Sequence, residues 1–173
     1  PLVVFSYANP IAALGWQAFA RRAASAGADG VLVVDLPVEE AAEHRAACAA
    51  AGLAAVFLAA PTTDDARLAA AVAASSGFLY CVARLGVTGA SSSLETGLAA
   101  DLARFKRAAG TLPVAVGFGV STPAQAAAAA RLADGVIVGS ALVRLLEGKD
   151  PEANASALWE AAAALSAALE RPC

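Results

Sequence analysis

The fold class of this 173-residue chain is indicated most clearly by residues 113–141, PVAVGFGVSTPAQAAAAARLADGVIVGSA. This stretch holds two short apolar runs, Pro113–Val116 and Gly135–Val138, and each run is followed by a glycine. Apolar runs without polar alternation are typical of strands that are covered on both faces, as in a parallel sheet. Thr122 followed by Pro123 predicts a helix start, because a hydroxyl caps the first turn and proline fits the first helical position. The stretch therefore predicts two consecutive βα units.

The same alternation extends back through the rest of the chain. Successive apolar runs begin 22 to 35 residues apart, which is a spacing typical of α/β units. No linker or change of composition divides the chain, so we expect a single domain over residues 1–173. The other predicted strands are Leu2–Tyr7, Gly30–Val34, Ala54–Ala59 and Phe78–Val82. The predicted helices are Trp16–Ala26, Glu39–Ala51, Asp65–Ala74, Leu98–Ala109, Pro123–Leu132 and Ala153–Glu170, with a further helix beginning at Ser140.

Glycines at the ends of the last two strands indicate a phosphate site. Gly117-Phe118-Gly119 and Gly139-Ser140 let backbone N–H groups approach an anion, and the loops after the last two strands of a TIM (β/α)₈ barrel commonly bind phosphate. The competing fold is an open doubly wound sheet, which usually has a glycine loop after its first strand. Here the first strand is followed by Tyr7-Ala8-Asn9-Pro10, which favours the barrel.

If the last two strands are the seventh and eighth of a barrel, the six visible strands are strands three to eight. A barrel is typically about 250 residues long, so we expect roughly 80 residues to precede this chain. The chain contains no methionine and opens on Pro1 directly before an apolar run, which agrees with a missing first part. We expect the isolated chain to be loosely packed or prone to aggregation, since two sheet edges would be left open.

Composition excludes several classes of protein and of site. Apolar residues make up 59% of the chain, so it is not a disordered tail, and a net charge of −3 predicts no nucleic-acid or anionic-membrane partner. Every apolar run is interrupted well short of the ~18 residues of a membrane helix. One histidine and three scattered cysteines predict no metal site and no disulfide framework. This cysteine usage indicates a cytoplasmic protein.

Six motifs, which together span the chain, carry a family resemblance. They are Phe5-Ser6-Tyr7-Ala8-Asn9-Pro10, Asp35-Leu36-Pro37-Val38-Glu39-Glu40, Pro61-Thr62-Thr63-Asp64-Asp65, Arg84-x-Gly86-Val87-Thr88-Gly89-Ala90, Gly117-Phe118-Gly119-Val120-Ser121 and Gly139-Ser140-Ala141. In this order they resemble the α subunit of tryptophan synthase.

The resemblance implies a lyase of tryptophan biosynthesis. The implied reaction is the retro-aldol cleavage of indole-3-glycerol phosphate to indole and glyceraldehyde 3-phosphate. Indole would then pass to a β subunit in an α₂β₂ heterotetramer. The pyridoxal phosphate of that complex would belong to the β subunit, and no cofactor is implied on this chain.

The resemblance also implies residue roles. The substrate phosphate would be bound by Gly89, Phe118, Gly119, Gly139 and Ser140. The indole pocket would be lined by Phe5, Tyr7, Leu32, Leu58, Tyr80 and Phe118, although simple core packing is the alternative for each of these. Arg84 and Thr88 would lie on a lid, which the long glycine- and serine-rich segment 84–93 also predicts, and a surface insertion without a role is the alternative. Asn9 and Pro37 would face the β subunit.

The acid–base chemistry of the reaction is not assigned to this chain. In the family, a glutamate and an aspartate on the second βα unit do this work, and that unit is expected upstream. Asp35, after the second visible strand, is a weak candidate for a base. The favoured alternative is a structural carboxylate that caps the helix beginning near Glu39 or bonds nearby backbone N–H groups. Asp64 is expected to cap a helix, Cys81 to be a small core residue, and His44 to be a solvated helix residue.

Two alternatives to the enzyme stay open. A barrel without its acid–base carboxylates could act only as a binding or regulatory partner of the β subunit. The chain could also be another phosphate-binding barrel, such as a sugar-phosphate isomerase or epimerase, although the segment 35–40 and the lid sequence argue against it.

Overall fold

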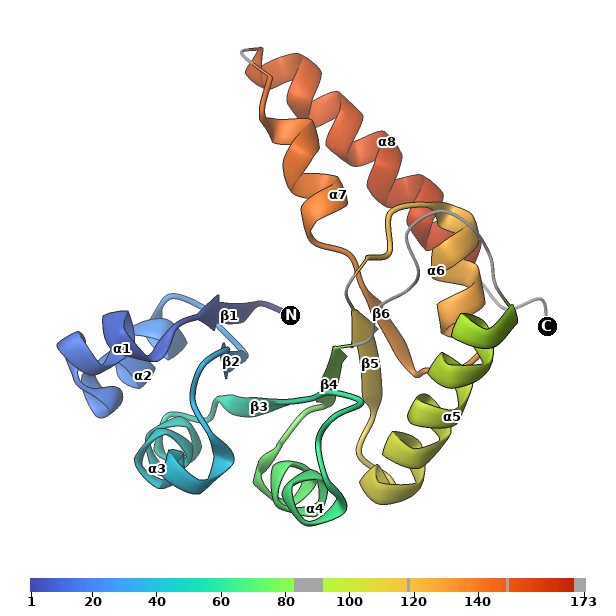
Figure 1. The fold of residues 1–173 in the computed structure, drawn as a ribbon. Helices are drawn as coiled ribbons and strands as arrows, with labels where there is room; N and C mark the ends of the chain where they lie inside the picture. Colours follow the sequence, from blue (N-terminus) through green and yellow to red (C-terminus); the bar gives the residue numbers. More distant parts are fainter. Residues whose placement is uncertain (83–91, 118, 149, 170–173) are drawn as a thin grey trace. The chain divides into compact units, whose positions relative to one another are not determined.

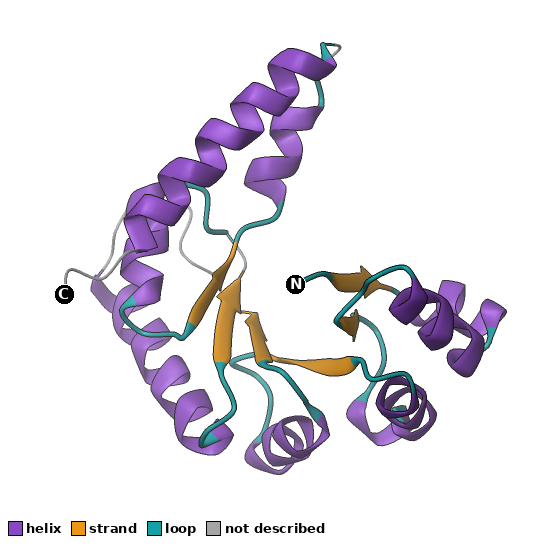
Figure 2. Cartoon of the chain, turned by 180° about the vertical axis from the view of Figure 1, so that it is seen from behind, coloured by secondary structure: helices purple, strands orange, loops and turns teal. Residues whose placement is uncertain are grey.

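Strands and helices alternate along the computed structural model of the chain, which describes residues 1–82, 92–117, 119–148 and 150–169 (Figure 1). The strands, drawn in orange in Figure 2, form one sheet whose order follows the chain from first to last. A doubly wound sheet would reverse its order at a switch point, so the sequential order is that of a (β/α)₈ barrel. The strands are β1 (Val3–Ser6), β2 (Gly30–Val33), β3 (Ala54–Ala59), β4 (Leu79–Val82), β5 (Val114–Gly117) and β6 (Gly135–Ile137).

Neighbouring strands pair in parallel with a defined register. Strand β1 pairs with β2 so that Phe5 lies opposite Leu32, and β2 pairs with β3 so that Leu32 lies opposite Val56. Strand β5 pairs with β6 so that Gly117 lies opposite Ile137. The carboxyl ends of paired parallel strands lie at the same edge of the sheet, where barrels place their functional loops.

The chain divides into two compact units, which are described separately. The first comprises residues 1–80 and 107–114, and the second comprises residues 81–106 and 115–173. The prediction of one domain over the whole chain stays a prediction.

The first unit buries all of β2 and most of β3. Val31, Leu32, Val56 and Leu68 are almost completely buried and form part of its core. Gly27 and Gly52 have φ values of 89° and 72°, a left-handed conformation that ends helices and suits glycine. Its helices are α1 (Ala8–Leu14), α2 (Trp16–Ser25), the 3₁₀ turn η1 (Val38–Glu40), α3 (Ala42–Ala50) and α4 (Asp65–Ala74).

The second unit buries Leu102, Phe105 and Val116, each at 0% exposure. Its helices are α5 (Ser92–Ala109), whose last turn belongs to the first unit, α6 (Pro123–Ala130), α7 (Ser140–Val143), the 3₁₀ turn η2 (Arg144–Leu146) and α8 (Pro151–Leu169). Within the described ranges, we find no helix with the length and hydropathy needed to cross a membrane.

Three helices differ from the sequence prediction. Helix α1 was not predicted, because the segment carries Pro10; that residue lies in the first turn, where a missing N–H costs no internal bond, and burial of Ile11 anchors the helix. The helix predicted from Glu39 begins as the separate turn η1 before α3. Helix α5 begins at Ser92, six residues earlier than expected.

His44 contradicts the expectation of a solvated side chain, since it is only 2% exposed. Its ring lies 5.4 Å from the ring of Trp16 and 6.2 Å from that of Phe57, measured between centroids. The Sγ atom of Cys48 lies 3.7 Å from its Nδ1. Burial lowers the pKa of His44, because the charged form loses its hydration. The imidazole is therefore a neutral core group that joins α2, α3 and β3.

Candidate functional site

Four residues with predicted indole-pocket roles lie on strands of the first unit. Phe5, Leu32 and Val56 are consecutive register partners, so their side chains share one face of the sheet. Leu58 lies two residues beyond Val56 and shares that face, because side chains alternate along a strand. The ring of Tyr80 on β4 meets the ring of Phe5 at a centroid distance of 6.4 Å and an angle of 62°. The structure thus brings Phe5 and Tyr80 into direct contact.

The predicted indole-pocket residues differ in their exposure to solvent. Leu32 is 1% exposed, so it packs in the core, whereas Phe5 is 61% exposed. Tyr7 is 62% exposed and occupies the residue just before α1. Burial raises the pKa of Tyr80, so its hydroxyl remains neutral at physiological pH. Phe5 and Tyr7 therefore have aromatic surface that a ligand could contact, and the buried ring of Tyr80 packs edge-on against Phe5.

A cavity of about 380 Å³ opens at the carboxyl ends of β2 and β3. Leu58, Asp35 and Pro37 are among the residues that line it. At its rim, the Nε of Arg67 lies 3.0 Å from Oε1 of Glu39. The cavity lies at the edge of the sheet where the barrel fold predicts a functional site.

The carboxylate of Asp35 has a structural partner. Its Oδ1 accepts a hydrogen bond from the backbone N–H of Ala8 at 2.7 Å. Ala8 is the first residue of α1, so the carboxylate lies at the positive end of that helix. This bond is of the kind expected from the favoured alternative for Asp35, although its partner is α1 and not the helix near Glu39. The choice between a structural carboxylate and a base stays a prediction. Asp64 caps α4 as expected, accepting the N–H of Arg67 at 2.8 Å.

The two residues predicted to face the β subunit are each close in sequence to one partner of the Ala8–Asp35 hydrogen bond. Asn9 is the second residue of α1, and Pro37 follows Asp35 by two positions. Both side chains are exposed. Their accessibility is what an interface role requires, and that role stays a prediction.

The predicted phosphate site of the second unit has two glycine-rich strand ends. Gly119 and Gly139 each lie two residues past the register pair of Gly117 and Ile137, so they follow neighbouring strands at the same edge. Gly119 is exposed with φ 86°, a conformation that other residues rarely adopt. Gly139 and Ser140 are also exposed, and they open α7 with the Gly139 carbonyl accepting from the Leu142 N–H at 2.9 Å. Backbone N–H groups at such glycine turns suit an anion.

Gln125 is a residue of this region that sequence reasoning missed. Thr122 and Gln125 form a reciprocal capping box at the start of α6. The Oε1 of Gln125 also accepts from the N–H of Ser121 at 2.9 Å and from its hydroxyl at 3.0 Å. These bonds hold the segment that follows Gly119. The spacing Thr-x-x-Gln was the signal that could have identified it.

Four residues with predicted roles lie outside the described residues. They are Arg84 and Thr88 of the predicted lid, together with Gly89 and Phe118.

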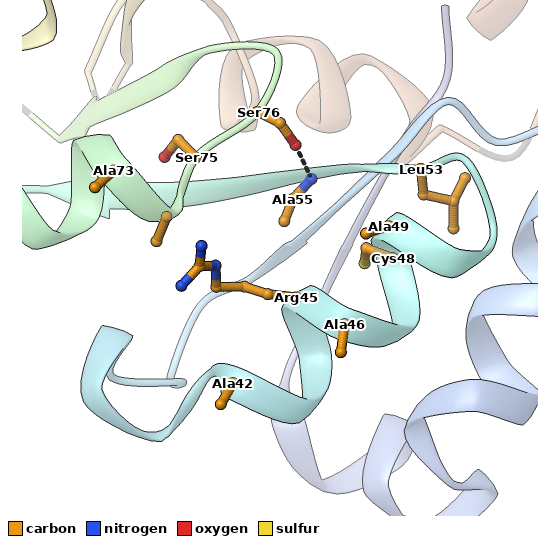
Figure 3. A pocket seen from close by; sticks show the side chains of 11 residues that line it. Ala42, Arg45, Ala46, Cys48, Ala49, Leu53, Ala55, Ala73, Ser75 and Ser76 are labelled. Atoms are coloured by element: carbon orange, nitrogen blue, oxygen red, sulfur yellow. Dashed lines mark hydrogen bonds between the residues drawn. The ribbon is translucent and has the colours of Figure 1, made fainter.

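A second cavity, of about 450 Å³, lies between α3 and α4 (Figure 3). None of the residues with predicted roles lines it. Figure 3 shows Arg45 extending from α3 into this space and the hydroxyl of Ser76 accepting the N–H of Ala55, at 3.0 Å. This cavity lies at the amino-terminal end of β3, the end where barrels carry stability and not catalysis.

The described part of the chain was searched for a reactive cysteine and for a group of metal-ligating side chains. Cys81 is completely buried, as predicted, and burial raises its pKa to about 12, so its thiol is unreactive. Among the described residues there is no cluster of histidine, cysteine and acidic side chains that could hold a metal ion.

Comparison with known proteins identifies one family. The family model described as "Tryptophan synthase alpha chain" matches residues 1–170. The tryptophan synthase alpha chain of Rhizorhabdus wittichii is 50% identical over 171 residues, which cover 99% of this chain and 62% of that protein. The alpha chain in a crystal structure from Legionella pneumophila is 34% identical, with a TM-score of 0.83. The match covers 98% of this chain and 62% of the Legionella chain. A chain of the tryptophan synthase complex from Pyrococcus furiosus is 37% identical, with a TM-score of 0.83. The match covers 96% of this chain and 66% of that chain.

These matches agree with the sequential parallel strands, and they confirm the prediction that this chain forms part of a TIM barrel. The chain spans about 62% of the length of the curated relatives that it matches. Because the family model extends over nearly every residue, from 1 to 170, this chain belongs to the tryptophan synthase alpha chain family.

Proposed function

We propose that this chain forms the larger part of an α subunit that cleaves indole-3-glycerol phosphate to indole and glyceraldehyde 3-phosphate. The observation that carries the proposal is the family match over residues 1–170. The same match disfavours the sugar-phosphate isomerase and epimerase alternatives.

The chain's contribution to this reaction is substrate binding. Gly119, Gly139 and Ser140 would hold the phosphate through backbone N–H groups and the Ser140 hydroxyl, with Gly89 and Phe118 completing the set. The shared sheet edge of Gly119 and Gly139 supports this role. An anion held by preorganised donors fixes the orientation of the whole substrate.

The aromatic end of the substrate would be bound in the first unit. Phe5 and Tyr7 expose aromatic surface, and Tyr80 meets Phe5 edge-on. An indole ring buries a large apolar area and favours offset or edge-to-face contacts with such rings. Leu32 and Leu58 share the sheet face of Phe5, and so would complete the apolar floor.

The chain alone would not complete the chemistry. Cleavage needs general acid–base catalysis. The family resemblance implies that a glutamate and an aspartate supply it, and neither is assigned to a residue of this chain. Asp35 is engaged with the Ala8 N–H, which does not support a role as a substitute base. We propose that the isolated chain binds substrate but does not turn it over.

The proposed partner is a tryptophan synthase β subunit in an α₂β₂ heterotetramer. The complex from Pyrococcus furiosus, to which this chain is similar, supports that partner. When pyridoxal phosphate is bound to the β subunit, it supplies the chemistry that joins indole to serine, and this chain would carry no cofactor. A cytoplasmic location fits this role.

A chimera separates substrate binding from catalysis. In it, this chain replaces the 171 matched residues of the Rhizorhabdus protein. We expect the chimera to release indole from indole-3-glycerol phosphate, and the isolated 173-residue chain to release none, with or without a β subunit. A folded chimera that binds the β subunit and releases no indole would favour the regulatory alternative. Substantial release by the isolated chain would show that a carboxylate present here does the chemistry.

A further inference from the structure

Two aspartates at opposite ends of β2 make the same kind of contact. The Oδ2 of Asp29 accepts the N–H of Leu2 at 2.6 Å, and the Oδ1 of Asp35 accepts the N–H of Ala8 at 2.7 Å. In both cases the donor lies 27 residues earlier in the chain. Asp29 thus ties the start of β2 to the segment before β1, and Asp35 ties the end of β2 to the helix after β1.

Helix α1 depends on this external contact at its first turn. Tyr7, the residue before the helix, makes no capping bond through its side chain, and the first turn contains no acidic residue. The first four N–H groups of a helix have no internal partner, and Pro10 has no N–H to offer. Asp35 supplies both an acceptor and a negative charge at this end, which are the two features that stabilise a helix start.

The contact also joins two exposed positions that are far apart in the sequence. Asn9 follows the bonded Ala8 directly, and Pro37 follows Asp35 by two residues. The sheet register continues up to this point, because the N–H of Val34 donates to the carbonyl of Ser6 at 2.9 Å. The carboxylate of Asp35 therefore ties the first turn of α1 to the loop after β2.

We propose that Asp35 is a positioning residue for β-subunit binding: by holding the first turn of α1, its carboxylate keeps Asn9 in place beside the loop of Pro37. This inference rests on the proposed function, since it takes the β subunit as the partner. Asp35 itself need not touch the partner. Its contribution is to reduce the ordering that the α1 turn would otherwise undergo on binding.

The test compares three variants of the full chain for binding to a tryptophan synthase β subunit. Asp35→Ala removes the acceptor, and we expect it to weaken binding about tenfold, the scale of a lost helix cap. Asp35→Asn keeps an acceptor oxygen and is expected to stay within about threefold of the wild type, because asparagine and aspartate cap helices equally well. Asp29→Ala is the matched control, as it loses an equivalent bond at the other end of β2.

Amide hydrogen exchange at Ala8, whose N–H donates to Asp35, provides a second readout. We expect faster exchange in Asp35→Ala and an unchanged rate in Asp29→Ala. Wild-type affinity in Asp35→Ala, or an equal loss in Asp29→Ala, would overturn the positioning role while leaving the partner intact. If the wild-type chain itself bound no β subunit, the proposed partner would be wrong and the positioning role would fall with it, even where the exchange rates confirmed the cap.

Discussion

The ring of Phe5 meets the ring of Tyr80 edge-on, with 6.4 Å between their centroids. The two residues are 75 positions apart in the chain, and one is largely exposed while the other is buried. An exposed aromatic ring that is held by a buried one is a rigid surface for a flat apolar ligand.

Removing the exposed ring tests that surface. Phe5→Ala should weaken the binding of indole-3-glycerol phosphate about tenfold, since both an aromatic contact and its apolar area are lost. Isothermal titration calorimetry measures this change. Trp159→Ala is the control, because Trp159 is 78% exposed on α8 and has no predicted role. An equal effect of both substitutions would contradict the pocket.

Substitution of Gly119 tests the phosphate end. Gly119→Ala forces a side chain into a φ of 86° and should destabilise the fold by roughly 1 kcal/mol. Gly110→Ala, at φ 61° in the turn before β5, should cost a similar amount of stability. Only the Gly119 variant should also weaken binding of indole-3-glycerol phosphate, which calorimetry measures. Equal affinities in the two variants would argue against a phosphate site there.

Gln125 should be needed for the loop that follows Gly119. Gln125→Ala removes bonds to the N–H and hydroxyl of Ser121 and to the N–H of Thr122, so we expect thermal stability and ligand affinity both to fall. Gln17→Ala, which loses one exposed bond of 3.4 Å to Glu43, should change neither. A Gln125 variant with wild-type affinity would show that this loop is set by other contacts.

His44 should make stability depend on pH. Its pKa is 6.5 in an unfolded chain and is lowered in the fold, so the unfolded state binds more protons between those two values. The contribution of His44 to the free energy of unfolding is therefore fully present above about pH 6.5. It falls as the pH drops, by at most about 1.4 kcal/mol per pH unit. Urea unfolding at several pH values measures the slope.

His44 is the only histidine of the chain, so His44→Phe should flatten that slope. An unchanged slope in the variant would place the titrating group elsewhere.

The sequence predicted the strands closely because their apolar runs and the glycines that follow are local signals. Helix α1 was missed because its support is not local: it depends on the burial of Ile11 and on Asp35, 27 residues after the Ala8 that it bonds. The burial of His44 was missed for a related reason. Its neighbours Trp16 and Phe57 come from other elements, and nothing in the segment around His44 reports them.

In the candidate site, too, local sequence signals were predictive and contacts between distant residues were not. Glycine at strand ends is a local signal that made Gly119 and Gly139 candidates, and the register of β5 and β6 places both at one edge of the sheet. Pocket residues such as Phe5 and Tyr80 came from the family resemblance alone, since an aromatic residue in an apolar strand has no local mark of a binding role. Their contact is a tertiary fact that composition and spacing do not encode.

Calorimetric titration of indole-3-glycerol phosphate into the 173-residue chain measures whether this chain binds the proposed substrate by itself. We expect saturable binding of one ligand per chain, without release of indole. A folded chain that gives no saturable heat would show that it does not bind the substrate.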